Sequence, residues 1–119
     1  MGRRVVVTGL GAITPIGHEK DQLWKSLCNG KSGISHITAF DTTGQDVLIA
    51  GEAVDFEPGK WFDKKEERRL DRFTQFAVAA AALAIEDSGL DLDKVDRYKA
   101  GTIIGTGIGG IIEIEAQHK

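Results

Sequence analysis

The sequence predicts an α/β protein with a mostly parallel or mixed sheet. Two β-branched runs that are typical of strands, "RRVVVTG" at residues 3–9 and "YKAGTII" at residues 98–104, lie near the two ends of the chain. Helical patterns lie between and after them, in the βα order that is typical of parallel sheets. With 119 residues, of which 41% are hydrophobic and 28% charged, the chain has a globular composition and the length of one domain at most.

The sequence pattern of the first half of the chain predicts two strands and one helix. Residues 3–9 have the continuous apolar character of a strand that is buried on both faces. A proline and two glycines predict a loop over residues 10–17. Residues 18–30 predict a helix with acidic residues in its first turn and an Asn-Gly pair at its end. A loop rich in Gly, Ser and Thr follows, and we expect a short strand within residues 46–54.

The best-marked element of the sequence is a long helix in the second half. Asp63 and Glu66 have the spacing of a capping box, so the helix is expected to begin near Lys64 and to continue to Gly89, a usual residue after a helix end. Its second half is apolar on every side, which is typical of a helix that is buried all round. Such burial requires more covering layers than one short sheet provides.

The last two predicted elements are the strand at residues 98–104 and a helix that begins at about Gly110. This helix is still amphipathic at Lys119 and has no stop signal. Together with the uncovered apolar helix, this pattern predicts that residues 1–119 are the N-terminal part of a larger α/β protein, with no complete second domain.

Composition excludes several classes of function. The formal net charge of −3 provides no global attraction for nucleic acid or for an anionic membrane. A single cysteine cannot build a disulfide framework, and the first residues have no secretory signal pattern. No apolar run is long enough to span a bilayer. We therefore expect a soluble cytoplasmic protein that binds neither nucleic acid nor membrane.

The segment "AGTIIGTGIGG" has three interpretations. Gly105, Gly107 and Gly110 match the dinucleotide-binding pattern G-x-G-x-x-G, but the acidic residue expected about twenty positions later would lie beyond the sequence. The glycines could instead serve close packing of a helix on a strand. In the third interpretation, Gly107 and Gly109 leave backbone room around Ile108, the one bulky side chain of the loop.

Cysteine and histidine provide no convincing site. Cys28 is the only thiol, and it falls in the last turn of a predicted helix, where the negative end of the helix dipole disfavours a thiolate. We therefore expect a buried structural cysteine. His18, His36 and His118 have no metal-ligand spacing, so no metal and no cofactor is predicted.

A basic run at the start of the long predicted helix is a candidate docking surface. Its members fall at positions i, i+3, i+4 and i+7, which predicts that they share one helix face. Two neighbouring glutamates partly offset the charge, so a merely solvated face is an equal alternative. The functional interpretation is a surface for an acidic or phosphate-bearing partner. These residues are Lys65, Arg68, Arg69 and Arg72.

The sequence resembles the N-terminal part of a β-ketoacyl-acyl-carrier-protein synthase, most closely the elongating type II enzyme. The resemblance rests on separated segments in order: "RRVVVTGLGAITPIG", "GKSGISHITAFDTT", "RRLDRFTQFAVAAAALAIEDSGL" and "GTGIGG". It covers essentially all 119 residues. It implies a thiolase-like fold layered α-β-α-β-α, no cofactor, and a homodimer when intact.

The resemblance also implies a reaction. An acyl group passes from a carrier protein to a cysteine, malonyl-carrier protein loses CO₂, and the resulting carbanion attacks the acyl thioester. The family's nucleophile and its two histidines come later than this sequence, and Cys28 does not match the nucleophile motif. No catalytic residue is therefore assigned, and the 119-residue chain alone is expected to be inactive.

Two sets of residues match functional positions of the family. Ile108, flanked by Gly107 and Gly109, matches the residue that closes the acyl pocket. Lys65, Arg68 and Arg69 match a docking patch for acyl-carrier protein in its acyl and malonyl forms. Two alternatives remain: a non-catalytic carrier-binding module, and a fragment of a dinucleotide-binding oxidoreductase. The sequence leaves acyl-chain preference open.

Overall fold

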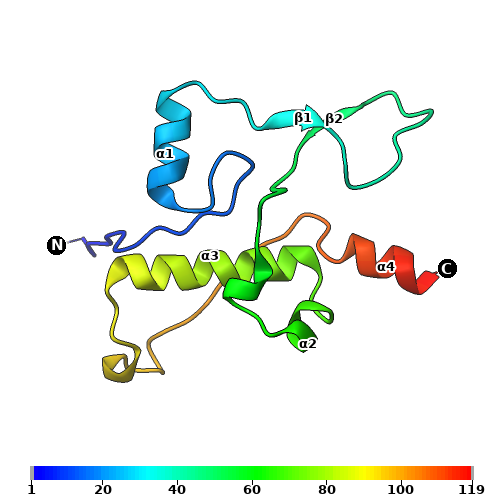
Figure 1. The fold of residues 1–119 in the computed structure, drawn as a ribbon. Helices are drawn as coiled ribbons and strands as arrows, with labels where there is room; N and C mark the ends of the chain where they lie inside the picture. The colour runs from blue at the N-terminus through cyan, green and yellow to red at the C-terminus, as the bar shows by residue number, and fades with distance from the viewer. Residues whose placement is uncertain (1, 119) are drawn as a thin grey trace. The chain divides into compact units, whose positions relative to one another are not determined.

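The computed structural model describes residues 2–118, and the chain forms two compact units. One unit is Ala12–Glu57, and the other combines Met1–Gly11 with Pro58–Lys119. The helices and strands of both units are labelled in Figure 1.

The unit Ala12–Glu57 contains helix α1 (Lys20–Cys28) and the short strands β1 (Ile34–His36) and β2 (Ile49–Gly51). The two strands pair antiparallel, with Ser35 opposite Ala50. Helix α1 and strand β2 lie where the sequence predicts a helix and a strand, which confirms both predictions. Strand β1 falls in the segment that was predicted to be loop.

Side chains hold this small unit together. The Ser26 hydroxyl on α1 donates to the backbone carbonyl of Ile16 at 2.7 Å, which fastens the helix to the loop before it. Just after β2, the Glu52 carboxylate accepts from the backbone N–H and the hydroxyl of Thr38, both at 2.9 Å, and from the N–H of Ala39 at 3.0 Å. This carboxylate therefore fixes the start of the loop that joins the strands.

The second unit is helical. It contains a short 3-10 turn at Pro58–Lys60, helix α2 (Lys64–Glu67), helix α3 (Arg72–Ser88), a second 3-10 turn at Leu92–Lys94 and helix α4 (Ile111–His118). Helix α3 is the long helix drawn from green to yellow in Figure 1. It ends at Gly89, whose φ of 62° is the left-handed conformation expected of a helix C-cap.

The long predicted helix is in fact two helices, so the prediction of one continuous helix is wrong. The capping box at Asp63 is present and starts α2 as expected. The chain then leaves helical geometry, and Asp71 adopts an extended conformation as the N-cap of α3. The buried amide of Gln75 donates to the backbone carbonyls of Glu67 and Leu70, both at 3.0 Å. These bonds replace the helical partners that a continuous helix would have supplied.

The strands predicted at residues 3–9 and 98–104 do not form within residues 2–118, and the one sheet there is antiparallel rather than mostly parallel. Both segments carry exposed β-branched side chains: Val5 is 86% exposed and Ile103 is 100% exposed. The reason is that a β-branched run supplies only propensity, whereas a strand needs a neighbour to complete its ladder. The described residues offer these two segments no such neighbour.

The N-terminal segment nevertheless packs closely on α3. A Cβ placed on Gly11 would overlap the carbonyl oxygen of Ala80, and one on Gly9 would overlap that of Ala84. Beside them, the Leu10 N–H donates to the Asp87 carboxylate at 2.9 Å. Opposing small residues thus let the backbone of residues 9–11 contact the backbone of the helix.

Burial of α3 is incomplete. Ala79 is fully buried, but Val78 and Ile85 on the same helix are exposed. The all-round burial that the apolar pattern predicted is therefore not found within residues 2–118.

Candidate functional site

The glycine-rich loop before α4 packs closely at Gly109 and has open space around Gly107. A Cβ on Gly109 would lie 2.8 Å from Cε2 of the Phe73 ring and 2.8 Å from the Thr106 hydroxyl oxygen, so a side chain there would have to displace the ring or the hydroxyl. Gly110, with a φ of 81°, leads into α4. A Cβ on Gly107 would meet nothing within 4 Å. Close packing therefore explains Gly109 but does not explain Gly107.

Ile108 lies between these two glycines and is 75% exposed. The structure brings it next to the loop's contact with Phe73 and leaves its side chain largely exposed. Its role as a pocket-closing residue therefore stays a prediction.

The dinucleotide interpretation loses its structural context. That motif requires a strand directly before the glycines, and residues 98–104 form no strand within the described part of the chain. The glycine match is therefore not accompanied by the βα turn that would bind a pyrophosphate.

Asp71 joins the beginnings of two helices. Its Oδ1 accepts from the Phe73 N–H of α3 at 3.4 Å, and its Oδ2 accepts from the Glu113 N–H of α4 at 3.4 Å. Free N–H groups at a helix start favour a carboxylate, so this side chain serves both helices. The continuous helix predicted from Lys64 to Gly89 would place Asp71 in a helix interior. The one local signal for its actual position is an N-cap type of residue before an apolar run.

The basic run does not lie on one helix face, so that prediction is wrong. Lys65 is in α2, Arg68 is its C-cap, Arg69 follows in a turn, and Arg72 is the first residue of α3. The break at Asp71 interrupts the 3.6-residue period on which the prediction depended. All four basic side chains are exposed, and the Arg72 guanidinium lies 4.9 Å from the centre of the Phe76 ring.

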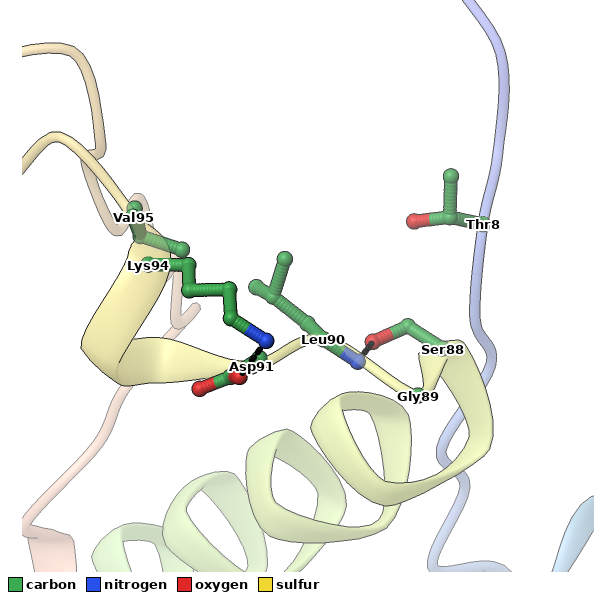
Figure 2. Close-up of a pocket in the computed structure, with 7 residues that line it drawn as sticks. All are labelled: Thr8, Ser88, Gly89, Leu90, Asp91, Lys94 and Val95. Carbon is green, nitrogen blue, oxygen red and sulfur yellow. Dashed lines mark hydrogen bonds and ion pairs between the residues drawn. The ribbon is translucent and has the colours of Figure 1, made fainter.

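A shallow cavity of about 280 Å³ lies at the C-terminal end of α3. Figure 2 shows its lining, in which Lys94 pairs with Asp91 at 2.8 Å and the Leu90 N–H donates to the Ser88 hydroxyl at 3.1 Å. These interactions belong to the turn that follows the helix. None of the predicted site residues lines this cavity.

Cys28 is exposed at the end of α1, so the expectation of a buried cysteine is wrong. The unit Ala12–Glu57 has just two buried apolar side chains, Ala53 and Phe56, so it offers little apolar core in which a cysteine could be buried. His18 instead packs edge-on against Phe56, with 6.2 Å between ring centres. Within residues 2–118, no group of three or more His, Cys, Asp or Glu side chains is arranged to hold a metal ion.

The carboxyl of Asp41 has a lowered pKa. The hydroxyl of Thr43, at 2.7 Å, and then its backbone N–H, at 2.9 Å, donate to Asp41 and hold the pKa of that carboxyl below its ordinary value. The group lies on an exposed loop far in sequence from the candidate residues. Among helices of the described chain, none has the length and apolar character needed to cross a bilayer.

Comparison with known proteins gives consistent matches. The family described as "Beta-ketoacyl synthase, N-terminal domain" matches residues 2–119. The 3-oxoacyl-[acyl-carrier-protein] synthase 2 of Synechocystis sp. is 46% identical over 115 residues, which are 97% of this chain and 28% of that protein. The synthase of the same name from Staphylococcus aureus (strain COL) is 44% identical over 117 residues, again 28% of its length. The chain thus spans little more than a quarter of these relatives.

Two solved structures are similar to the chain. The ishigamide ketosynthase/chain length factor has a TM-score of 0.71 and 43% identity, over 78% of this chain and 23% of that one. A type II PKS acyl-carrier protein in complex with its ketosynthase (AntDE:AntF) has a TM-score of 0.57 and 28% identity, over 81% and 25%. These likenesses confirm the α/β class predicted from the sequence.

Proposed function

The chain belongs to the β-ketoacyl synthase family, and from this membership we propose that it forms part of a condensing enzyme of fatty-acid elongation. The observation that carries the proposal is 44–46% identity to 3-oxoacyl-carrier-protein synthases along nearly the whole chain. Because the chain spans 28% of these relatives, the proposed activity is that of the longer protein of which these residues would be the N-terminal part.

The proposed reaction is the one implied by the family. An acyl group is transferred from carrier protein to a cysteine thiol, and the carrier thiol leaves. Malonyl-carrier protein then loses CO₂, and its α-carbon attacks the acyl thioester to give β-ketoacyl-carrier protein and the free cysteine. Cys28 is not the nucleophile of this proposal, because it ends a helix whose dipole disfavours a thiolate.

For the exposed apolar segments we propose burial in the longer protein. Val5 and Ile103 have the β-branched character of inner strands and are exposed, so they could complete a mostly parallel sheet of a layered thiolase-like fold. The exposed Val78 and Ile85 of α3 would be covered by the same assembly. A cytoplasmic homodimer is the assembly that the family resemblance implies.

We propose that Ile108 closes the acyl pocket. It lies in a loop with open space at Gly107 and a fixed contact at Gly109, so it could project against an acyl chain while its backbone stays close to α3. Its present exposure is consistent with a side chain whose contacts come from substrate and from residues outside this chain.

We propose that Lys65, Arg68 and Arg69 bind the carrier protein. The three side chains are exposed and are separated by at most four positions around the end of α2. Positive charges gathered in a chain of net charge −3 create a local field that would attract an acidic or phosphate-bearing partner. The break between α2 and α3 means that the three residues do not share one helix face, but they are still neighbours in sequence.

The docking proposal is tested by charge reversal in the longer protein. Lys65→Glu with Arg68→Glu should raise the KM for carrier-linked substrates and leave turnover of small pantetheine thioesters nearly unchanged. The loss should diminish as salt is added, because exposed charges act mainly on association and are screened. Lys25→Glu with Lys31→Glu, a matched reversal at two other exposed lysines, is the control. Equal losses on both kinds of substrate would show that the patch is structural.

The activity itself is tested by incubating the longer protein with acyl-carrier protein and malonyl-carrier protein. The proposal requires CO₂ release that depends on the acyl partner, together with a β-ketoacyl product on the carrier. Decarboxylation without a condensed product would contradict it.

A further inference from the structure

The glycine loop that carries Ile108 is attached to α3 through one carboxylate. Asp71 uses its two oxygens on different helices: Oδ1 accepts from the Phe73 N–H and Oδ2 from the Glu113 N–H, each at 3.4 Å. Glu113 is in the first turn of α4, directly after the loop. A bond between residues 42 positions apart therefore holds the end of the loop at the start of α3.

The same loop has a second contact with α3, at Gly109. The ring of Phe73, two residues after Asp71, occupies the space that a side chain at Gly109 would need. Ile108 is the neighbour of that glycine. The position of Ile108 is therefore set by Asp71 on one side of the loop and by Phe73 beneath it.

The start of α3 is itself hydrogen-bonded to the preceding basic segment. Gln75, which is 7% exposed, donates its amide to the carbonyls of Glu67 and Leu70. The first turn of α3 thus contacts the end of α2 through Gln75 and the glycine loop through Asp71.

We propose that Asp71 is a positioning residue that holds Ile108 in place and thereby limits the length of acyl chain accepted. The inference rests on the proposed function, in which Ile108 closes the acyl pocket. A carboxylate suits this role because it has an acceptor oxygen for each of two helix starts at once. When one of the two bonds is lost, the loop can move away from α3, and Ile108 moves with it.

Asp71→Asn tests this mechanism selectively. The amide keeps one acceptor oxygen, so one helix start stays capped, and its NH₂ group cannot accept from the other. Asp63→Asn is the matched control, because Asp63 caps α2 through a single oxygen that accepts from Lys65 and Glu66. Both changes remove one negative charge beside the basic residues. A difference in chain-length preference between the two variants therefore results from the position of the loop rather than from the lost charge.

The measurement is kcat/KM of the longer protein for carrier-linked acyl primers of increasing length, with thermal melts of every variant. For Asp71→Asn we expect kcat/KM for the longest accepted primer, relative to that for the shortest, to rise about fivefold, the equilibrium effect of one lost hydrogen bond. Phe73→Leu, which shrinks the ring under Gly109, should move the ratio in the same direction. Asp63→Asn should leave the ratio unchanged.

A uniform loss of activity that follows a lower melting temperature, or an unchanged ratio in both the Asp71 and the Phe73 variants, would overturn the inference. Amide hydrogen exchange of the same variants separates it from the proposed function. Faster exchange in residues 105–114 of Asp71→Asn, but not of Asp63→Asn, would support the positioning role even if the protein did not condense substrates. A wild-type protein without condensation activity would refute the proposed function, and unchanged exchange would refute the role of Asp71.

Discussion

Replacing Gly11 with alanine should disrupt the contact between the N-terminal segment and α3. A Cβ at this position would overlap the carbonyl oxygen of Ala80 and would lie 2.7 Å from the backbone nitrogen of Ala84. Both atoms belong to a helix backbone, which cannot rotate away as a side chain could. The segment 9–11 must therefore shift away from α3, and the bond from Leu10 to Asp87, now 2.9 Å, must stretch or break.

The expected cost follows from these contacts. One methyl group forced into close packing lowers the free energy of unfolding by about 1–3 kcal/mol. Gly59→Ala is the control, because a Cβ there would meet nothing within 4 Å and Gly59 has no left-handed backbone. That change should be neutral or should stabilise by about 0.4–1 kcal/mol, since alanine restricts the unfolded chain.

The assay is urea unfolding of the longer protein and its two variants, followed by circular dichroism. We expect a lower urea midpoint for Gly11→Ala only. Equal midpoints for the two variants would show that the segment 9–11 does not pack on α3 as described.

Three further changes test other parts of the account. Ile108→Phe should keep activity on short acyl primers and lose it progressively on longer ones, because one methylene in an apolar pocket discriminates by about 1–3 kcal/mol; an equal loss at all lengths, with a lower melting temperature, would leave Ile108 only a packing role. Gln75→Leu should lower the stability by about 1–3 kcal/mol in thermal melts, because the carbonyl of Glu67 loses a buried donor; an unchanged melt would mean that water replaces the amide. Thr43→Val should raise the pKa of Asp41 toward its ordinary value in an NMR titration, because the hydroxyl bond is lost and the backbone bond stays. A lowered pKa in the folded state stabilises the fold at pH values above the pKa of the unfolded chain, and this stabilisation is lost as pH falls through the folded-state pKa. The stability of Thr43→Val should therefore depend less on pH in that acidic range.

Local signals predicted local structure well. The capping box at Asp63, the helix end at Gly89 and the helix over Lys20–Cys28 each depend on residues a few positions apart, and all three are present. The break at Asp71 was missed because an aspartate followed by apolar residues fits both a helix interior and a new N-cap. The break is accompanied by hydrogen bonds from the Gln75 amide to the carbonyls of Glu67 and Leu70, and these partners are visible only in the folded chain.

Long-range features could not be predicted from the sequence. The runs at residues 3–9 and 98–104 have strong strand propensity, yet whether they form strands depends on neighbours that the described residues do not supply. The basic run was assigned to one face by extending a helical period across a break. The bond from Asp71 to Glu113 joins positions 42 residues apart, and no pattern of spacing indicates it.

The identity of the product on the carrier tests the central claim most directly. The longer protein and the 119-residue chain are each incubated with acyl-carrier protein and malonyl-carrier protein, and the carrier-bound products are identified by mass spectrometry. The account predicts a β-ketoacyl group two carbons longer than the primer from the longer protein, and no such product from the chain alone, which lacks the family's nucleophile and histidines. Failure of the longer protein to form this product, or its formation by the 119-residue chain, would contradict the account.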